Sequence, residues 1–406
     1  MDPLISAAAK ALSKGQPLRT LNLVALRDDA AALALRGIAM AQLGDLDQAK
    51  LLLKRAVRAF EPKEPLARAR CVVAHAEIAF VSRDLGWPPK QLAMARETLE
   101  AHGDFPNAAH AAHLQARRSL LLGRLEEAEQ ILGGVDHSRL PPARSAAHQV
   151  ILAGLAMRRL HAKVAREAFT RAEEAARISG IQALQAEVRK NFLLLDAPAA
   201  RKIHRGEERL INLAEVETLL ASGAFVVDAC RRVVRHGRVV VPLTSRPVLF
   251  SLARQLSESW PHDVSRDELI RSAFEARKID DSHRARLRVE IGRLRKLLLA
   301  LAEIRSTRQG YTLHPCRGAE LNLLAWPVDE DHSSLLAFLA DGEAWSSSAL
   351  ALALGVSQRT VQRALDVLAA DGRVLSLGLG RARRWITPAP ADFATTLLLP
   401  APVPGR

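Results

Sequence analysis

Cysteine is scarce in this sequence, and long apolar runs are missing from it. The three cysteines in 406 residues are far apart and never in CxxC spacing, which excludes a disulfide framework and a zinc module. The richest apolar run, residues 297–302, is far shorter than the roughly 18 residues that a membrane span needs. The first residues also lack the basic and then apolar segments of a secretory signal. These absences predict a protein of the reducing cytoplasm with no membrane partner.

Signatures of catalysis and of cofactor binding are missing too. The chain has neither HExxH nor GxxxxGK followed by Ser or Thr, and Gly378-Leu379-Gly380 lacks the third glycine of a dinucleotide-binding turn. His110 and His113 share a helix face, but no acidic or cysteine partner stands at ligand spacing. We therefore interpret both as surface residues. The sequence predicts no enzyme, no cofactor and no metal site.

The charge is strongly basic, but its total alone does not identify a partner. Lys and Arg number 58 against 44 Asp and Glu, a formal charge of +14. Residues 1–200 carry 28 basic and 21 acidic side chains and residues 201–406 carry 30 and 23, so each half contributes +7. An argument for nucleic acid must therefore depend on where the arginines cluster.

Residues 1–200 are interpreted as a helical repeat domain. Alanine and leucine recur at helical spacing, and residues 37–61 form the best repeat unit. A small residue allows close packing and a larger one four positions later fills the gap, an arrangement that resembles tetratricopeptide (TPR) hairpins in an α-solenoid. A non-repetitive helical bundle remains the alternative. The positions with spacing 0, +4, +7 are Ala49, Leu53 and Ala56; Ala128, Leu132 and Val135; and Ala165, Phe169 and Ala172, with a weaker unit at Ala95 and Leu99.

The polar, basic residues 201–221 read as a linker, and the pattern changes after them. Three β-branched runs, with a turn at His236-Gly237, predict strands and a hairpin. A capping box of Ser265 and Glu268 opens the second of three predicted helices. The predicted strands are 225–227, 233–234 and 239–241, the helices are 247–256, 265–274 and 282–302, and a short hairpin follows at 305–313.

Four short motifs in this region resemble OmpR/PhoB-type winged-helix DNA-binding domains. The motifs are Val241-Pro242-Leu243-Thr244, Val264-Ser265-Arg266-Asp267-Glu268-Leu269, Ile291-Gly292-Arg293-Leu294-Arg295-Lys296 and Gly310-Tyr311. The resemblance implies that residues 222–318 form a small sheet, three helices and a C-terminal β-wing, and that they bind double-stranded DNA.

The same resemblance implies a partner and leaves one question open. In such activators the loop before the third helix contacts RNA polymerase, and here that loop includes Arg277, Lys278 and Asp280. Glu290 and Gly292 stand where the family often has a histidine and a basic residue, and the wing is one residue short. The base preference therefore stays open.

The third helix can also be interpreted from its residues alone. At 100° per residue an apolar seam forms on one side, opposite Ala285, Val289, Gly292 and Lys296. Residues 282–309 carry 8 basic and 2 acidic side chains. We expect the guanidinium groups to project outward, away from the protein's own carboxylates, with Arg293 on a guanine edge and Val289 on a thymine methyl. The seam is Leu287, Ile291, Leu294, Leu298 and Leu301. The predicted contacts that are mainly to phosphate or the minor groove are Arg286, Arg288, Arg295, Arg305 and Arg308, and Arg284 and Lys296 are further predicted DNA contacts.

Residues 330–388 resemble a second winged helix-turn-helix domain. Predicted helices at 332–340 and 349–354 are followed by Gly355 and by a helix that Ser357 caps. Winged helices also bind proteins, so that role remains an alternative. A proline-rich tail, 389–406, is predicted to be disordered. The predicted core is Leu350, Leu354, Val356, Val361, Leu365 and Leu368, and the predicted DNA contacts are Gln358, Arg359, Thr360 and Arg363 with Arg381, Arg383 and Arg384 in the wing.

Together these patterns predict a mainly α, multi-domain chain, with a TPR-like α-solenoid followed by two α+β winged-helix domains. The leading hypothesis is a nucleoid-associated bacterial transcription regulator, with activation favoured, whose repeats bind a regulatory protein or peptide. A homodimer is among the partners considered. The alternative is a scaffold whose winged helices contact proteins.

Overall fold

The protein is mainly helical, with a few small sheets. The computed structural model describes residues 2–14, 16–82, 88–274, 276, 278–327, 332–339, 344–378, 380 and 383–386. Two compact units are present: one comprises Met1–Arg158, Val164–Phe192 and Ser334–Arg406, and the other Arg159–Lys163 and Leu193–Ser333. Across these described ranges, none of the helices has the length and apolar character of a membrane span.

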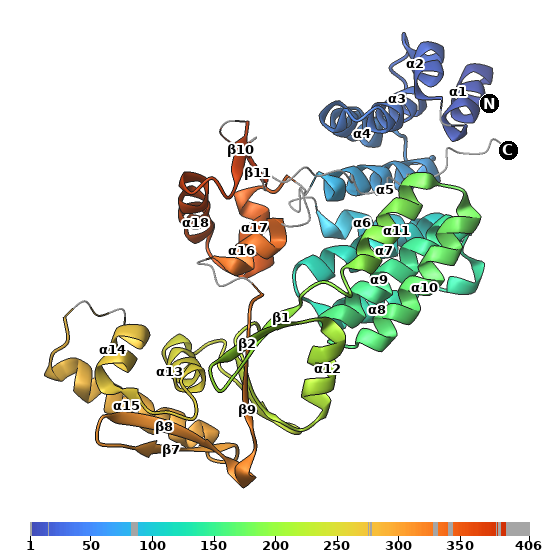
Figure 1. The fold of residues 1–406 in the computed structure, drawn as a ribbon. Coiled ribbons are helices and arrows are strands. Elements are labelled where there is room, and N and C mark those ends of the chain that lie inside the picture. Colours follow the sequence, from blue (N-terminus) through green and yellow to red (C-terminus); the bar gives the residue numbers. More distant parts are fainter. Residues whose placement is uncertain are drawn as a thin grey trace. The chain divides into compact units, whose positions relative to one another are not determined.

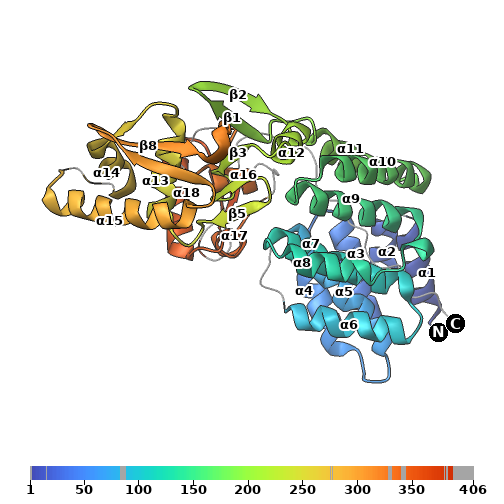
Figure 2. The same cartoon turned by 90° about the horizontal axis from the view of Figure 1, so that it is seen from below.

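A row of helices makes up the N-terminal part of the first unit (Figure 1). Each helix from α1 to α9 contacts the next, and the odd-numbered helices from α1 to α9 also contact one another in order, so the helices stack as hairpins. Figure 2 shows α9, α10 and α11 side by side. The helices are α1 (Pro3–Ser13), α2 (Pro17–Val24), α3 (Ala30–Gln42), α4 (Leu46–Ala59), α5 (Pro65–Val81), α6 (Pro89–Ala101), α7 (Phe105–Leu121), α8 (Leu125–Gly133), η1 (His137–Arg139), α9 (Pro142–Arg158), α10 (Ala162–Ser179) and α11 (Gln182–Leu193).

Small residues allow these helices to approach closely. A Cβ atom on Gly37 in α3 would lie 2.8 Å from Cγ of Leu53 in α4. The positions predicted from the 0, +4, +7 spacing are buried, except Val135, which is half-buried. The sequence interpretation of this spacing as the buried face is therefore confirmed at eight of its nine main positions and at Ala95 and Leu99.

The second unit is built on a six-stranded sheet, which overturns the prediction of a linker at 201–221. Those residues form most of the β1–β2 hairpin, which turns at Arg205-Gly206, and the helix α12. Ile203 and Ile211 are buried, while Glu207, Glu208 and Arg209 of β2 are exposed, so the polar composition of this segment did not indicate two strands. The elements are β1 (Ala200–His204), β2 (Glu207–Ile211), α12 (Leu213–Ala221), β3 (Phe225–Asp228), β4 (Val233–His236), β5 (Val239–Pro242) and β9 (Leu321–Ala325).

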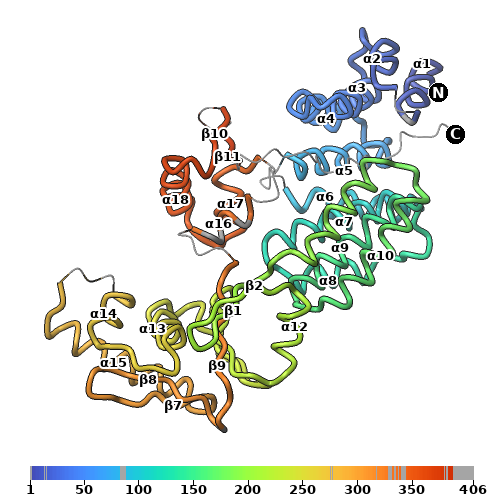
Figure 3. The backbone as a smooth tube through the Cα atoms, viewed as in Figure 1, coloured from blue at the N-terminus to red at the C-terminus, as the bar shows by residue number. Residues whose placement is uncertain are grey.

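The strand order β2-β1-β9-β3-β4-β5 brings distant segments together (Figure 3). β9 pairs antiparallel with β1 and parallel with β3, and the remaining pairs are antiparallel. Arg201 stands opposite Ala325 in this register. The chain that enters the unit and the chain that leaves it are thus neighbouring strands.

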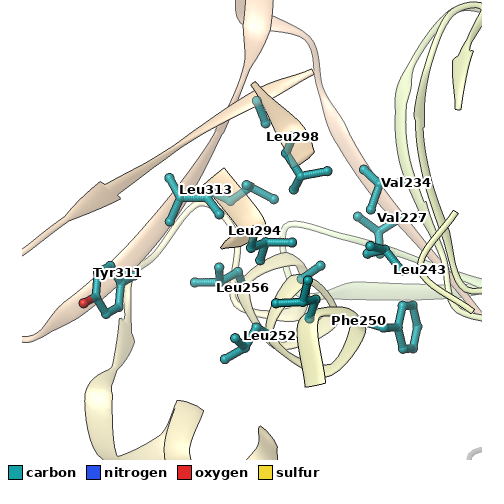
Figure 4. Packing of buried hydrophobic residues seen from close by; sticks show 14 of the residues in the cluster. Val227, Val234, Leu243, Phe250, Leu252, Leu256, Leu294, Leu298, Tyr311 and Leu313 are labelled. Atoms are coloured by element: carbon teal, nitrogen blue, oxygen red, sulfur yellow. The ribbon is translucent and has the colours of Figure 1, made fainter. Parts of the chain in front are cut away.

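Three helices and a smaller sheet complete the second unit. Figure 4 shows their shared core, in which Leu294 lies between Leu298 and Leu313 on one side and Leu252 and Leu256 on the other. The last helix ends at Leu298, earlier than predicted, because the chain turns there into a strand that begins at Ala302. The elements are α13 (Pro247–Glu258), β6 (Val264–Ser265), α14 (Arg266–Phe274), α15 (Asp281–Leu298), β7 (Ala302–Ser306), β8 (Gly310–Pro315) and η2 (Cys316–Gly318), with sheet order β6-β8-β7.

The C-terminal part of the first unit has its own core. Trp345 and Trp385, 0% and 1% exposed, exchange two backbone hydrogen bonds and were not among the predicted core residues. Val356 was predicted to be buried but is 45% exposed, because Gly355 turns the chain in the left-handed region just before it. The predicted tail, 389–406, lies outside the described residues. The elements are α16 (Ser333–Leu339), α17 (Ser347–Leu354), α18 (Gln358–Ala370), β10 (Leu375–Leu377) and β11 (Arg384–Ile386).

Candidate nucleic-acid interface

Helix α15 is held by a polar cap and an apolar seam. Asp280 caps its start by accepting hydrogen bonds from the Ser282 hydroxyl at 2.7 Å and the His283 backbone N–H at 3.0 Å. These bonds hold the pKa of Asp280 well below its usual range. The predicted seam is confirmed, since its five residues are each at most 1% exposed. The opposite face of α15 therefore points away from the core of the unit.

That outward face carries small side chains flanked by basic ones, as predicted. Val289 is 54% exposed, and a Cβ atom on Gly292 would meet nothing within 4 Å. Ala285 and Lys296 are exposed beside them. A strip of small residues allows another surface to come close to the helix backbone. The exposed arginines around this strip are Arg284, Arg286, Arg288, Arg293 and Arg295.

Contrary to expectation, three of the contact arginines predicted on α15 and β7 form ion pairs with the protein's own carboxylates. Arg293 Nη1 lies 2.8 Å from Glu290 Oε1, and Arg305 donates two hydrogen bonds to Glu303. Arg284 is 3.4 Å from Asp281. Their side chains nevertheless remain 64%, 57% and 55% exposed for Arg293, Arg305 and Arg284. Ion pairs with exposed carboxylates are worth about 0 to 1 kcal/mol, so Arg305 and Arg284, whose partners Glu303 and Asp281 are 62% and 98% exposed, can exchange partners.

Arg295 links two elements of the unit, a role that the sequence did not indicate. Its Nε donates to the carbonyl of Ile304 at 2.8 Å and its Nη2 donates to Ser306 Oγ at 2.9 Å, which ties α15 to β7. Arg266 acts similarly at the hairpin tip, since it donates to the carbonyls of Arg308 and Thr307 at 3.0 and 3.1 Å. The pattern of side chains along the chain carries no signal for such bonds to distant carbonyls.

The remaining residues of the predicted interface are placed as follows. The Arg286 guanidinium lies 4.4 Å from the centre of the Phe274 ring. Arg308 and Lys278 are exposed. Arg277 lies outside the described residues, and Asp280 is the helix cap described above.

A hollow of about 550 Å³ lies beside α15, next to the start of α13. Arg293 and Lys296 contribute to it from α15, and Arg246, which the sequence analysis did not select, contributes from the start of α13. Glu290 is the acidic residue of its lining. Three cations against one carboxylate make the hollow suited to a polyanion. Its apolar lining is Pro247, Val248, Leu249 and Leu297.

The residues predicted on α18 are gathered at its start. Ser357 caps the helix by accepting from the Thr360 N–H at 3.1 Å, and Gln358 Nε2 donates to Ser347 Oγ at 3.0 Å. Arg359 and Arg363 are exposed. In the adjoining hairpin, the Arg383 guanidinium lies 4.1 Å from the centre of the Trp385 ring, and Arg384 is half-buried. Arg381 lies outside the described residues.

The interpretation of His110 and His113 as surface residues is wrong, since they are 4% and 2% exposed. His110 Nε2 lies 2.8 Å from Glu77 in α5, and His113 Nε2 lies 3.1 Å from Nδ1 of His148 in α9. Burial, aided by the charge of Arg144, lowers the pKa of His110 to about 4. Both histidines face neighbouring helices of the stack, a contact that spacing along one helix does not disclose. Within the described part of the chain, no group of three His, Cys, Asp or Glu could hold a metal ion.

Comparison with known proteins adds no further constraint. Protein-family models, curated proteins and solved structures give no match to this chain. Its function is therefore inferred from the geometry and charge described above.

Proposed function

We propose that this protein is a sequence-specific, double-stranded DNA-binding transcription regulator. The observation that carries the proposal is α15, whose apolar seam is buried while its opposite face presents small residues and exposed arginines. The DNA major groove, roughly 12 Å wide, accepts a helix of this kind. Arginines at the flanks then reach base edges and phosphates.

The order of elements around α15 supports this proposal. A small sheet, three helices and the β7–β8 hairpin follow one another, as in OmpR/PhoB-type winged-helix domains, which we propose for this unit. The six-stranded sheet is larger than that arrangement needs, because β1, β2 and β9 join it. We assign α17, α18 and the β10–β11 hairpin to a second winged helix.

The stacked hairpins of α1 to α11 are proposed to be a TPR-like domain that binds a regulatory protein or peptide. Lys278, in the loop before α15, is the described basic residue proposed to contact RNA polymerase. On this proposal the protein acts in the cytoplasm, on the nucleoid, and as an activator. Neither an enzyme activity nor a cofactor is part of the proposal.

The salt dependence of DNA binding tests the proposal. Each neutralised phosphate contributes about −0.9 to the slope of log K against log salt concentration. We expect the full chain, titrated against a fluorescent random duplex, to give a slope of about −5 or steeper. Selection from random oligonucleotides should then return a motif. A slope near zero, or no enriched motif, contradicts sequence-specific binding.

A second candidate function is a scaffold whose C-terminal winged helix binds a protein. The observation that favours it is an exposed apolar set in that part of the chain: Leu352, Val356, Leu375 and Leu377 are 45% to 54% exposed. Apolar side chains of this size at a surface are typical of protein contacts when they are contiguous. The same titration separates the two functions, since a scaffold gives little salt-dependent affinity for DNA.

A further inference from the structure

Glu290 is the carboxylate in the lining of the hollow beside α15, among the cations Arg246, Arg293 and Lys296. It lies one helical turn before Arg293, and its Oε1 accepts a hydrogen bond from Arg293 Nη1 at 2.8 Å. The Glu290 side chain is 13% exposed, whereas that of Arg293 is 64% exposed. The Glu290 side chain is therefore largely covered, while the Arg293 guanidinium that it pairs with remains open to a ligand.

This pairing affects phosphates and bases differently. A phosphate that approaches Arg293 must compete with Glu290 for the guanidinium and is repelled by the carboxylate. A guanine edge is neutral and offers the acceptors O6 and N7. A guanidinium has several N–H donors, so those that Glu290 leaves unused can reach these acceptors while the ion pair stays intact.

We propose that Glu290 is a specificity-determining positioning residue, which holds Arg293 for a guanine edge and keeps it from phosphates. The inference rests on the proposed DNA-binding function. It predicts that Glu290 lowers the affinity for random DNA and raises discrimination between sequences. The hollow beside α15 supports this division between base and phosphate contacts. Arg246 and Lys296 line it together with Glu290, and both are exposed to an approaching phosphate.

The test uses the full chain and Glu290→Gln, which removes the charge and keeps the shape of the side chain. Binding is measured on the duplex selected by the unchanged protein and on a scrambled duplex of the same composition. We expect affinity for the scrambled duplex to rise about tenfold at low salt, with a slope steeper by about 0.9 as Arg293 gains a phosphate. Repeated oligonucleotide selection should show weaker preference at one guanine.

Glu303→Gln is the matched control, because Glu303 holds Arg305 on β7 in a similar carboxylate–arginine pair. We expect this change to raise affinity for both duplexes by the same factor and to leave the selected motif unchanged. Glu290→Asp keeps the charge and should retain most of the discrimination.

Each outcome bears on one of the two proposals. Unaltered discrimination in folded Glu290→Gln overturns the role of Glu290, and so does a loss of affinity for both duplexes. An unchanged protein that binds no DNA in a salt-dependent manner overturns the proposed function and this inference with it. Should Glu290→Gln not fold, Arg293→Lys takes its place, because a lysine ammonium lacks the planar set of donors with which a guanidinium can bond a base and a carboxylate together. The Arg293→Lys protein should show a weaker preference for guanine at that position of the motif, and an unchanged motif overturns the inference.

Discussion

A Cβ atom on Gly310 would lie 1.7 Å from the carbonyl oxygen of Val264. Gly310 begins β8 and stands opposite Ser265 in β6, so the two strands meet where only glycine fits. β8 also pairs along β7, whose Ile304 carbonyl and Ser306 hydroxyl accept hydrogen bonds from Arg295 of α15. The close approach of Gly310 to Val264 therefore helps to place the hairpin against the proposed recognition helix.

Gly310→Ala is expected to destabilise the second unit by about 2 to 4 kcal/mol, because the backbone of β6 cannot move aside as a flexible side chain can. Amide hydrogen exchange of β6, β7 and β8 in the full chain measures the loss. Gly292→Ala is the control, since a Cβ there meets nothing within 4 Å. It should stabilise α15 by about 0.5 to 1 kcal/mol. If the amides of β6, β7 and β8 are equally protected from exchange in Gly310→Ala and Gly292→Ala, the steric argument is contradicted.

Arg293→Ala and Arg288→Ala should weaken DNA binding in different ways. Loss of the guanine contact of Arg293 should cost about 1 to 3 kcal/mol on the selected sequence and little on random DNA. Loss of Arg288 should weaken all sequences alike and reduce the salt slope by about 0.9. Arg295 is unsuitable for this comparison, because its removal also deletes two hydrogen bonds between α15 and β7. If both variants lose the same affinity for the selected sequence and for random DNA, the assignment of Arg293 to a base is contradicted.

The buried histidines predict acid sensitivity of the helical stack. Burial lowers the pKa values of His110 and His148 to about 4 and that of His113 well below its ordinary value of 6.5. The unfolded chain therefore takes up protons first, so stability is complete above about pH 6.5 and is lost as pH falls toward 4. At pH 5 His110 alone accounts for a loss of about 2 kcal/mol.

Hydrogen exchange of α7 and α9 at pH 7.5 and pH 5.5, corrected for the intrinsic rates, measures this loss. The full chain with His102→Gln serves as the control, because His102 is exposed at the end of α6. It should keep the pH dependence of the unchanged protein. His110→Gln should show a weaker dependence. Equal protection of α7 at the two pH values contradicts the prediction.

Trp345→Ala is expected to unfold the C-terminal core. The side chain is fully buried and lies edge-on to Phe338 at 5.6 Å between ring centres. Removal of such a side chain costs about 3 to 5 kcal/mol. Tryptophan fluorescence and hydrogen exchange of α17 and α18 report the loss. Leu375→Ala, at a 49% exposed position of β10, should change little, and a similar effect of both substitutions contradicts this view of the core.

Local patterns determined a large part of the fold from sequence. The 3.6-residue period placed the seam of α15, the β-branched runs placed β3, β4 and β5, and the Ser265–Glu268 capping box placed the start of α14. Such signals are reliable because residues three or four apart on a helix, or two apart on a strand, share a face whatever the rest of the chain does.

The candidate interface was predicted only in outline. The exposed strip of α15 was found, but the pairing of Arg293 with Glu290 was not. Arg246 was missed because it reaches the hollow from α13, more than forty positions earlier in the chain. A hollow between two elements depends on how they pack, and no periodicity within either element encodes that.

The sequence by itself placed α13, α14, α15, β3, β4 and β5 and the apolar face of α15, because these features follow from neighbours along the chain, but it did not reveal β1 and β2. Tertiary structure alone decided that Lys202 pairs with Leu324 across the sheet, and that His113 meets His148 in the stack. Backbone donors and acceptors are alike at nearly every residue, so the side chains of a strand do not specify which strand it pairs with. Burial of a polar side chain likewise depends on which element comes to lie against it.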